Sequence, residues 1–339
     1  MIPNYIDSLL KEARKYLGVK FDTIYLGGGT ASLLNNNVPR LMNCLKINFD
    51  LASILEATIE ANPDSITVNF LNMAISSGFN RISIGVQSFN DYELENVGRI
   101  HSSTQAINAI KHAKKAGFKK ISADLILGLP GQTIESLKRS IEVLICLDVN
   151  HISTYCLSIE EGTLLSKNIP TNLPTEEDQV KLYEYAQEMM YNNNLIQYEI
   201  SNFAKPGYEC LHNINYWHGG EYIGLGPAAA SHLNGKRFKN KDDLFAYLTD
   251  PTGQIDEDEQ LDLKRKAAEE IILRLRLLKE GANIKMLEER FGYRNIKEIF
   301  TRIDKLVSIN SLTFDGVSYR LPKNKVLVSN PILTDILGD

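Results

Sequence analysis

Apolar residues in the first half of the chain follow two alternating patterns, one typical of helices and one typical of strands. Positions three or four apart predict an amphipathic helix over residues 6–17. Further helices are expected at 64–77, at 104–117 with Gly117 as the C-cap, and after Thr133, whose hydroxyl suits an N-cap. Between the helical stretches, short apolar runs predict five strands, at 22–26, 54–60, 81–86, 120–127 and 151–157.

Alternation of strands with helices is typical of an α/β fold with a parallel sheet. Two architectures fit five such units: an open, doubly wound sheet or part of a barrel. The spacing of the predicted elements is compatible with both architectures. In both, the carboxyl ends of the strands lie along one rim, where ligands bind.

The second half of the chain is less regular. A long helix is expected at 176–194, followed by loops rich in Gly and aromatic residues over 202–235. From residue 257 the pattern predicts three helical stretches, a hairpin turning at Asp315-Gly316, and a last short helix, which together resemble a winged helix. The domains are expected to divide into a core at 1–160, an extension at 161–240 and an α+β domain at 241–339.

Charge limits the classes of partner. The net charge is −5, and acidic and basic residues are interspersed, which argues against nucleic acid as a partner. Residues 257–339 show no basic stripe, so the winged-helix-like part is interpreted as a packing module. The charged residues Lys11 and Arg14 lie within the first predicted helix, whereas the core of a secretory signal is apolar. We therefore expect a cytoplasmic protein without a transmembrane segment.

Four cysteines occur, and no two of them are close enough in sequence to form a compact metal-binding run: Cys44, Cys146, Cys156 and Cys210. We interpret them as free, mostly buried thiols.

Polar and glycine residues follow the ends of four successive predicted strands. A run of three glycines, Gly27 to Gly29, precedes Thr30 and lets backbone approach a ligand closely, although a tight turn would explain it equally well. Glu60, Gln87 and Asp124 end the next three strands and should converge with Thr30 on the rim. Arg99 follows the third strand; its planar guanidinium suits a carboxylate, and the alternative is a surface ion pair.

In order and spacing these segments resemble the radical S-adenosylmethionine (SAM) family of oxygen-independent coproporphyrinogen III oxidases, over almost the whole chain. The resemblance implies a partial (β/α)6 TIM-like radical SAM barrel with a C-terminal winged-helix-like α+β domain. It also implies roles in binding SAM: backbone contacts to its amino group at the glycine motif, the ribose at Glu60, and further contacts elsewhere. The implied SAM-binding residues are Gly28, Gly29, Thr30, Glu60, Gln87, Arg99 and Asp124.

The segment His212-Asn-Ile-Asn-Tyr-Trp217 resembles the H-N-x-x-Y-W motif of the heme chaperone branch, HemW. The branch associates this motif with heme, and a histidine beside flat apolar side chains suits an axial ligand. Without the resemblance, a lone histidine in a loop is more often a hydrogen-bonded structural residue. His232 is a second candidate, and His218 could compete. The implied heme-binding residues are His212, Asn213, Tyr216 and Trp217.

The resemblance further implies a 4Fe-4S cluster, held in the family by a C-x3-C-x2-C loop after the first barrel strand. This chain begins after that point of the family pattern, so we expect a barrel lacking its first strand, with no cluster ligands and no catalytic residue assigned. A misplaced start codon, a degraded or split gene, and a protein that dispenses with the cluster all remain open. The next strand would have an unpaired edge, which leaves a homodimer open as well.

Three functions remain. The first is a heme chaperone that binds heme and transfers it to an acceptor protein, inactive in cluster chemistry as this chain stands. The alternatives are an oxygen-independent coproporphyrinogen III oxidase and a cluster-free heme-binding protein. Whether the chain is an enzyme stays open.

Overall fold

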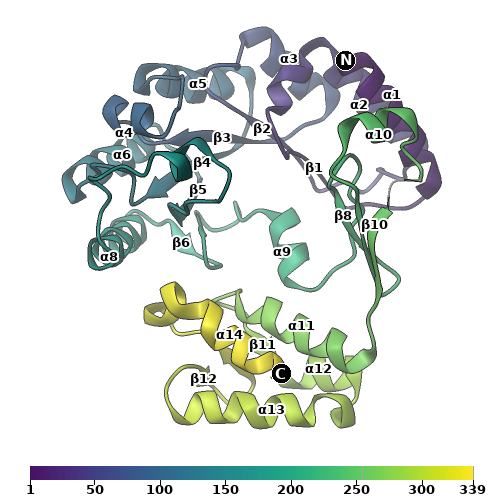
Figure 1. The fold of residues 1–339 in the computed structure, drawn as a ribbon, viewed down its shortest axis with the longest axis vertical. Helices are drawn as coiled ribbons and strands as arrows, with labels where there is room; N and C mark the ends of the chain where they lie inside the picture. The colour runs from purple at the N-terminus through teal and green to yellow at the C-terminus, as the bar shows by residue number, and fades with distance from the viewer. Residues whose placement is uncertain (254, 339) are drawn as a thin grey trace.

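A computed structural model describes residues 1–253 and 255–338, and its largest feature is a curved seven-stranded sheet (Figure 1). The strands lie in the order β1-β2-β3-β4-β5-β7-β6. The first five are parallel, as predicted: β1 (Thr23–Leu26), β2 (Glu56–Ala61), β3 (Arg81–Gln87), β4 (Lys120–Leu127) and β5 (His151–Cys156). Antiparallel pairing adds β7 (Asn202–Ala204) and β6 (Ile196–Gln197). Consecutive strands are neighbours throughout β1–β5, without the reversal of order that defines a doubly wound sheet.

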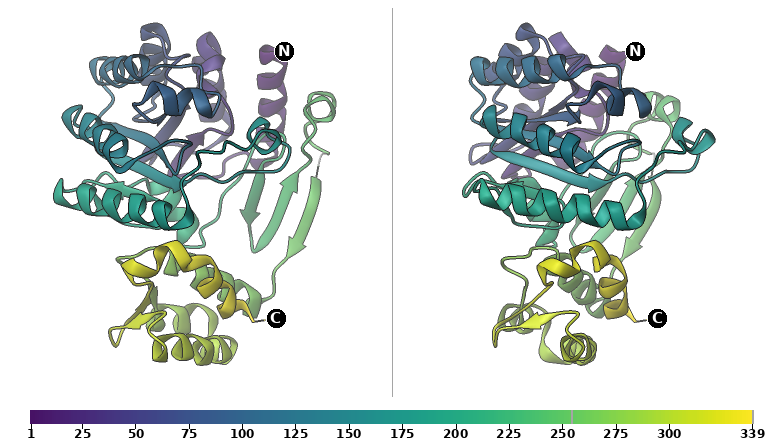
Figure 2. Two further views of the ribbon diagram at one scale, coloured as in Figure 1. Left: turned by 60° about the vertical axis from the view of Figure 1, so that its left-hand side comes forward. Right: turned by 90° about the vertical axis from the view of Figure 1, so that its left-hand side faces the viewer.

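Helices cover the convex face of this sheet (Figures 1 and 2). Thr133 caps α6 by accepting a hydrogen bond from the Ser136 amide, and Gly117 ends α5 with a φ of 109°, as predicted. Three helices, α2, α4 and α7, were not expected from the sequence. The helical segments up to residue 192 are α1 (Ile2–Ala13), η1 (Arg14–Tyr16), η2 (Ala31–Asn37), α2 (Val38–Asn48), α3 (Val68–Ser77), α4 (Asp91–Asn96), α5 (Ser103–Ala116), α6 (Ile134–Cys146), α7 (Leu164–Lys167) and α8 (Glu176–Asn192).

The two faces of the parallel sheet differ in chemistry. Residues such as Ile59, Ile82 and Ile152 point outward and are fully buried beneath the helices. The positions between them point to the concave side and are mostly polar, which is unusual for parallel strands, since these are commonly apolar on both faces. The polar inward positions are Thr23, Tyr25, Glu56, Thr58, Glu60, Arg81, Ser83, Ser122, Asp124, His151, Ser153 and Tyr155.

The segment after β7 was expected to be loops, and this expectation is wrong for much of it. It contains a helix and the start of a second, antiparallel sheet with the order β10-β9-β8. The pairing of β9 with β10 crosses the predicted domain boundary at residue 241. The division of the chain into domains stays a prediction. The elements are α9 (Leu211–Trp217), β8 (Ala230–Leu233), β9 (Lys236–Asn240), α10 (Leu244–Thr249) and β10 (Ile255–Gln260).

A buried carboxylate joins this second sheet to the first helix. Glu12 of α1 accepts hydrogen bonds from the Gly226 amide (2.9 Å), Asn240 Nδ2 (2.6 Å) and the Tyr247 hydroxyl (2.6 Å). Three donors on one buried carboxylate hold α1, β9 and α10 together.

The C-terminal part contains helices packed on a small three-stranded sheet, β11-β13-β12. Asp315 accepts hydrogen bonds from the amides of Val317 and Ser318, so the predicted hairpin turn is confirmed. The winged-helix assignment stays a prediction, which the order of elements supports: α11 (Leu263–Leu275), β11 (Ala282–Asn283), α12 (Ile284–Phe291), α13 (Tyr293–Ser308), β12 (Thr313–Phe314), β13 (Ser318–Arg320), η3 (Lys323–Val328) and α14 (Ser329–Leu337). None of the helices in the described ranges combines the length and hydropathy needed to span a membrane.

A buried ion pair fixes the chain that precedes α9. Arg81 and Glu56 are 1% and 0% exposed, and Arg81 Nε lies 2.9 Å from Glu56 Oε2. The guanidinium also donates to Ser122 Oγ at 3.0 Å and to the carbonyl oxygens of Tyr208 (2.7 Å) and Glu209 (2.8 Å). Burial alone would raise the pKa of Glu56, but Arg81 and Lys120 hold it below its ordinary value.

We expect Arg81→Met to lower the free energy of unfolding by about 3–5 kcal/mol, because it leaves the Glu56 carboxylate buried without its main partner. Urea unfolding followed by circular dichroism measures the change. The matched control is Arg139→Met, which breaks an exposed pair with Glu135 and should change stability by no more than about 0.5 kcal/mol. Equal losses in the two variants would contradict the role given to Arg81.

Candidate functional site

The glycine run and Glu60 meet at the carboxyl ends of β1 and β2. Glu60 Oε1 accepts a hydrogen bond from the Tyr25 hydroxyl at 2.8 Å, and Oε2 accepts one from the Gly28 amide at 3.3 Å. Gly27 lies so close that a Cβ there would be 2.7 Å from the Glu60 carboxyl carbon, so any larger residue would push the carboxyl group out of its present position. The glycines therefore do more than form a turn: they allow the backbone to lie directly against the Glu60 carboxylate.

Asp124 lies beside this group, at the same end of the sheet. The pKa of Asp124 is raised to about 6: burial and the negative charge of Glu60 raise it, while Ser153, Ser83 and Arg99 oppose the rise. Ser83 Oγ donates to Asp124 Oδ1 at 3.3 Å. Arg99 also acts on this carboxylate, because its positive charge lowers the pKa of Asp124.

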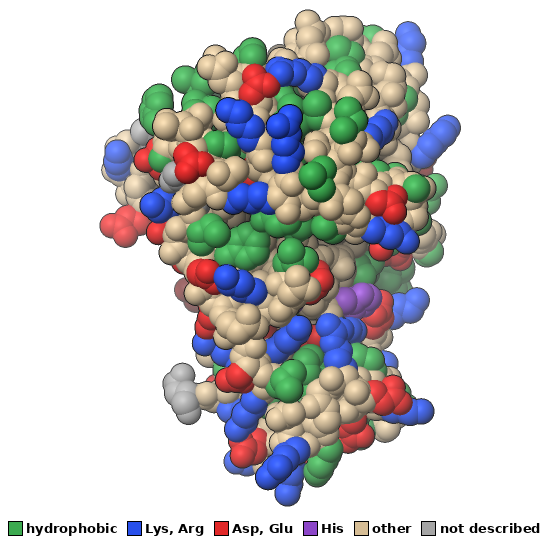
Figure 3. Space-filling model, turned by 90° about the vertical axis from the view of Figure 1, so that its right-hand side faces the viewer, with side chains coloured by type: hydrophobic (Ala, Val, Ile, Leu, Met, Phe, Trp, Pro, Cys, Tyr) green, Lys and Arg blue, Asp and Glu red, His purple; other side chains and the backbone are tan. Residues whose placement is uncertain are grey.

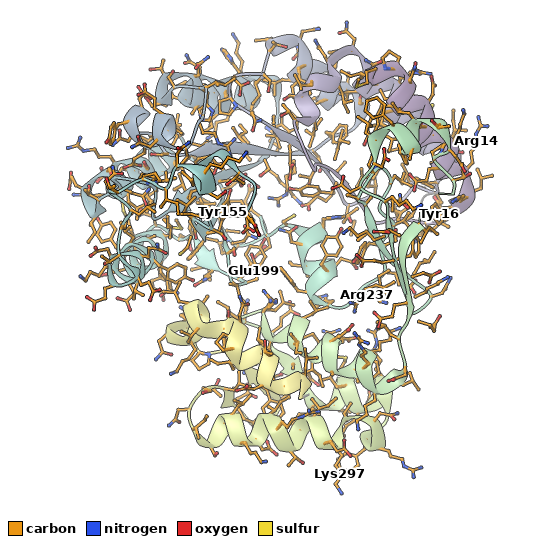
Figure 4. All side chains as sticks on the ribbon, in the orientation of Figure 1. Arg14, Tyr16, Tyr155, Glu199, Arg237 and Lys297 are labelled. Atoms are coloured by element: carbon orange, nitrogen blue, oxygen red, sulfur yellow. The ribbon has the colours of Figure 1, made fainter. Side chains whose placement is uncertain are left out.

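Gln87 and Thr30 complete the predicted set. Gln87 sits at an irregularity in the pairing of β3 with β4, with a φ of 66°, and its Oε1 accepts a hydrogen bond from the Tyr155 hydroxyl at 3.2 Å. Figure 4 shows Tyr155 on the concave side of the sheet. Thr30 Oγ1 accepts a hydrogen bond from Asn62 Nδ2 at 3.1 Å, two residues beyond Glu60. The residues predicted to converge on the rim are thus brought together.

Sequence reasoning missed several residues of this rim. Tyr25, Tyr155 and Ser83 contact the predicted residues directly, yet the sequence analysis assigned them no role. A signal for them exists in the strands themselves, because polar residues recur at every second position of β1–β5 and so share one face.

The predicted heme motif folds as α9 on the concave side of the sheet, against β1 (Figure 1). The Glu56 carboxylate lies at the helix N-terminus, where Oε1 is 3.4 Å from both the His212 amide and Cys210 Sγ. A negative charge at this end of a helix is stabilising. The buried Arg81–Glu56 pair therefore positions His212.

Both ring nitrogens of His212 have partners. Nδ1 lies 2.8 Å from Thr23 Oγ1, and Nε2 lies 3.2 Å from the Tyr216 hydroxyl. The ring stacks on Tyr25, with centroids 5.1 Å apart and planes at 28°. Burial lowers the pKa of His212 to about 4, so the imidazole is neutral at pH 7.

The other candidates of the motif have different surroundings. The backbone N–H of Asn213 opposes the rise in the pKa of the Cys210 thiol. Trp217 packs against the C-terminal part, where the Arg276 guanidinium lies 5.3 Å from its ring centre. His218 pairs with Glu280 at 2.7 Å, and His232 Nδ1 lies 3.2 Å from the Gly220 carbonyl oxygen.

A cavity of about 720 Å³ reaches part of each predicted site: Gly28, Gly29 and Thr30 line it, and its lining does not include Glu60, Gln87, Arg99, Asp124, Asn213 or Trp217. It runs beside β1 from the glycine run to α9, and both His212 and Tyr216 line it. Most of the other lining residues are apolar or aromatic and include Leu9, Ile24, Leu26, Leu41 and Tyr222. Figure 3, which views the molecule from the side of the second sheet, shows acidic and basic side chains intermingled over that face.

The four cysteines lie in different elements and do not fit a cluster. Cys44 is in α2, Cys146 ends α6, Cys156 ends β5 and Cys210 precedes α9. Only Cys210 is buried, so the expectation of mostly buried thiols is wrong. Within residues 1–253 and 255–338, no three His, Cys, Asp or Glu side chains converge as a metal site. A 4Fe-4S cluster needs three nearby thiolates, and these cysteines do not supply them.

Comparison with known proteins identifies the family of the chain. Residues 3–144 match the Radical SAM superfamily. The chain is 37% identical to the heme chaperone HemW of Lactococcus lactis over 100% of this chain and 90% of that protein. It is 34% identical to the heme chaperone HemW of Bacillus subtilis over 94% of this chain and 86% of that protein.

Among solved structures, the coproporphyrinogen III oxidase HemN of Escherichia coli, a radical SAM enzyme, matches with a TM-score of 0.86. The match covers 99% of this chain and 83% of HemN at 21% identity, so it establishes a shared fold. Together with the near full-length similarity to the HemW proteins, these findings show that the chain belongs to the HemW family of the radical SAM superfamily.

Proposed function

We propose that this protein is a heme chaperone, which binds heme in the cavity beside β1 and transfers it to an acceptor protein. The observation that carries the proposal is the position of His212 in the wall of a large, mainly apolar cavity. A porphyrin offers flat apolar faces and an iron that takes a nitrogen ligand, and the cavity matches both needs. The HemW relatives are heme chaperones, which supports the same substrate class.

His212 is chemically suited to the iron because its imidazole is neutral at physiological pH. The low pKa, about 4, keeps a nitrogen lone pair free of a proton even in mild acid. Nε2 would exchange its contact with the Tyr216 hydroxyl for the iron, while Thr23 keeps the ring oriented through Nδ1. Asn213 and Trp217 would act by holding the ends of α9.

We further propose that the rim binds SAM. The Gly28 and Gly29 backbone would face the amino group, Glu60 the ribose hydroxyls and Arg99 the carboxylate. Thr30, Gln87 and Asp124 would provide the remaining contacts, with the Asp124 charge facing the sulfonium. The support is the close packing of Gly27 and Gly28 on the Glu60 carboxylate and the polar cluster around Asp124.

No catalytic step is proposed. The family implies a 4Fe-4S cluster, but the cysteines described above do not fit its ligand set, and electron delivery to SAM depends on that cluster. The likeness to HemN is one of fold and carries no decarboxylase activity to this chain. A carrier that binds heme without a cluster stays within the proposal, and heme titration of the chain tests it directly.

We expect His212→Ala to weaken heme binding by about tenfold or more, which corresponds to about 1.4 kcal/mol, because the iron loses its nitrogen ligand. Titration with hemin, followed by the Soret band, measures the affinity. His112→Ala, on the exposed face of α5, is the matched control and should bind as the unsubstituted protein does. A Soret band unchanged by His212→Ala would remove His212 from the site.

We expect SAM affinity to fall by about tenfold as the pH drops from about 7.5 to about 5. The pKa of Asp124 is about 6, so its carboxylate is charged above that pH, attracts the sulfonium, and loses this attraction when it is protonated. Isothermal titration calorimetry at several pH values measures the dependence. Asp124→Asn should bind weakly at every pH with a flat profile, and a slope that persists in this variant would show that another group is responsible.

A further inference from the structure

We propose that Tyr25 couples the nucleoside site at the rim to the His212 site, so that each ligand strengthens binding of the other. This inference rests on the proposed function, since it takes heme to bind at His212 and an adenosyl ligand at Glu60. Tyr25 is the residue of β1 that contacts both sites, one with its hydroxyl and one with its ring.

The hydroxyl of Tyr25 is hydrogen-bonded to the carboxylate of Glu60, the residue proposed to bind the ribose. It donates to Glu60 Oε1 at 2.8 Å, while the Gly28 amide donates to Oε2 at 3.3 Å. Gly27 packs against the carboxyl group from another side. A ribose diol that takes both oxygens of Glu60 therefore competes with the Tyr25 hydroxyl and the Gly28 amide for the lone pairs of this carboxylate.

The ring of Tyr25 holds His212 in its present position. The two rings stack at 5.1 Å, and Thr23, two residues earlier on the same face of β1, holds Nδ1 at 2.8 Å. On the other side, the Tyr216 ring meets the imidazole edge-on, at 4.9 Å, and its hydroxyl contacts Nε2 at 3.2 Å. His212 is thus clamped between two tyrosines, and one of them is also bonded to Glu60.

These contacts explain why each ligand should strengthen binding of the other. Loss of the Glu60 acceptor leaves the hydroxyl of a largely buried tyrosine without a partner, which favours a shift of its ring. A shifted ring loosens the stack on His212 and allows Nε2 to leave Tyr216 for the iron. When the adenosyl ligand is bound, heme no longer has to supply the free energy that moves Tyr25, so heme binds more tightly. By thermodynamic linkage, bound heme must strengthen binding of the adenosyl ligand by the same factor.

The test measures hemin affinity of the full chain by Soret titration, without and with saturating SAM. In the unsubstituted protein we expect SAM to tighten hemin binding by about fivefold or more. Tyr25→Phe keeps the stacking ring but removes the hydroxyl, so both ligands should still bind while the ratio of the two hemin affinities falls to about one. The matched control is Tyr319→Phe, which removes a tyrosine-to-carboxylate hydrogen bond, with Asp304 at 2.7 Å, in the C-terminal part. This control should keep the full coupling.

A second measurement uses the unsubstituted protein alone, so its result does not depend on whether a variant folds correctly. SAM affinity of the unsubstituted protein, measured by calorimetry with and without bound hemin, must change by the same factor as the hemin affinity. Hemin binding that ignores SAM, or a coupling retained by Tyr25→Phe, would overturn the inference while leaving the heme proposal intact. Absence of hemin binding by the unsubstituted protein would instead overturn the proposed function, and the coupling with it.

Discussion

The buried pair of Arg81 and Glu56 is the interaction on which the rest of the site depends. Two opposite charges at the amino ends of neighbouring strands are almost completely removed from water, so each requires the other. Both side chains also reach the same stretch of chain: Arg81 binds carbonyl oxygens just before α9, and Glu56 faces the first turn of that helix. A short helix with few contacts of its own is thereby attached to the concave face of the sheet.

The alternation of polar and apolar residues along the strands decides what that concave face can do. Outward isoleucines and valines pack beneath the helices and stabilise the sheet, while inward side chains form two polar levels. The level near the amino ends of the strands, with Glu56 and Arg81, is structural. At the level of the carboxyl ends, with Glu60 and Asp124, the pKa of Asp124 is raised, and within residues 1–253 and 255–338 no cation lies as close to either carboxylate as Arg81 lies to Glu56. This difference separates the part that holds the fold from the part available to a ligand.

Tyr25 and His212 lie between these two levels and face one cavity. Because β1 places Thr23 and Tyr25 on the same face, a single strand contacts the imidazole through a hydroxyl and a ring. The same strand also reaches Glu60 through the Tyr25 hydroxyl, which is the contact on which the proposed coupling rests. The C-terminal part contributes from the other side, where Arg276 covers Trp217 and the Leu278 amide bonds the Tyr198 carbonyl oxygen at 3.0 Å.

The sequence by itself determined the five parallel strands, the capped helices between them and the convergence of Glu60, Gln87 and Asp124. These follow from local periodicity and from the fact that parallel strands end on one rim. Its motifs also identified the family. Only the tertiary structure decided that residues 211–217 form a helix, that Tyr25 joins Glu60 to His212, and that Trp217 faces Arg276. A helix of seven residues is too short to be stable alone, and the contacts that hold it join residues more than 150 positions apart, which no local pattern encodes.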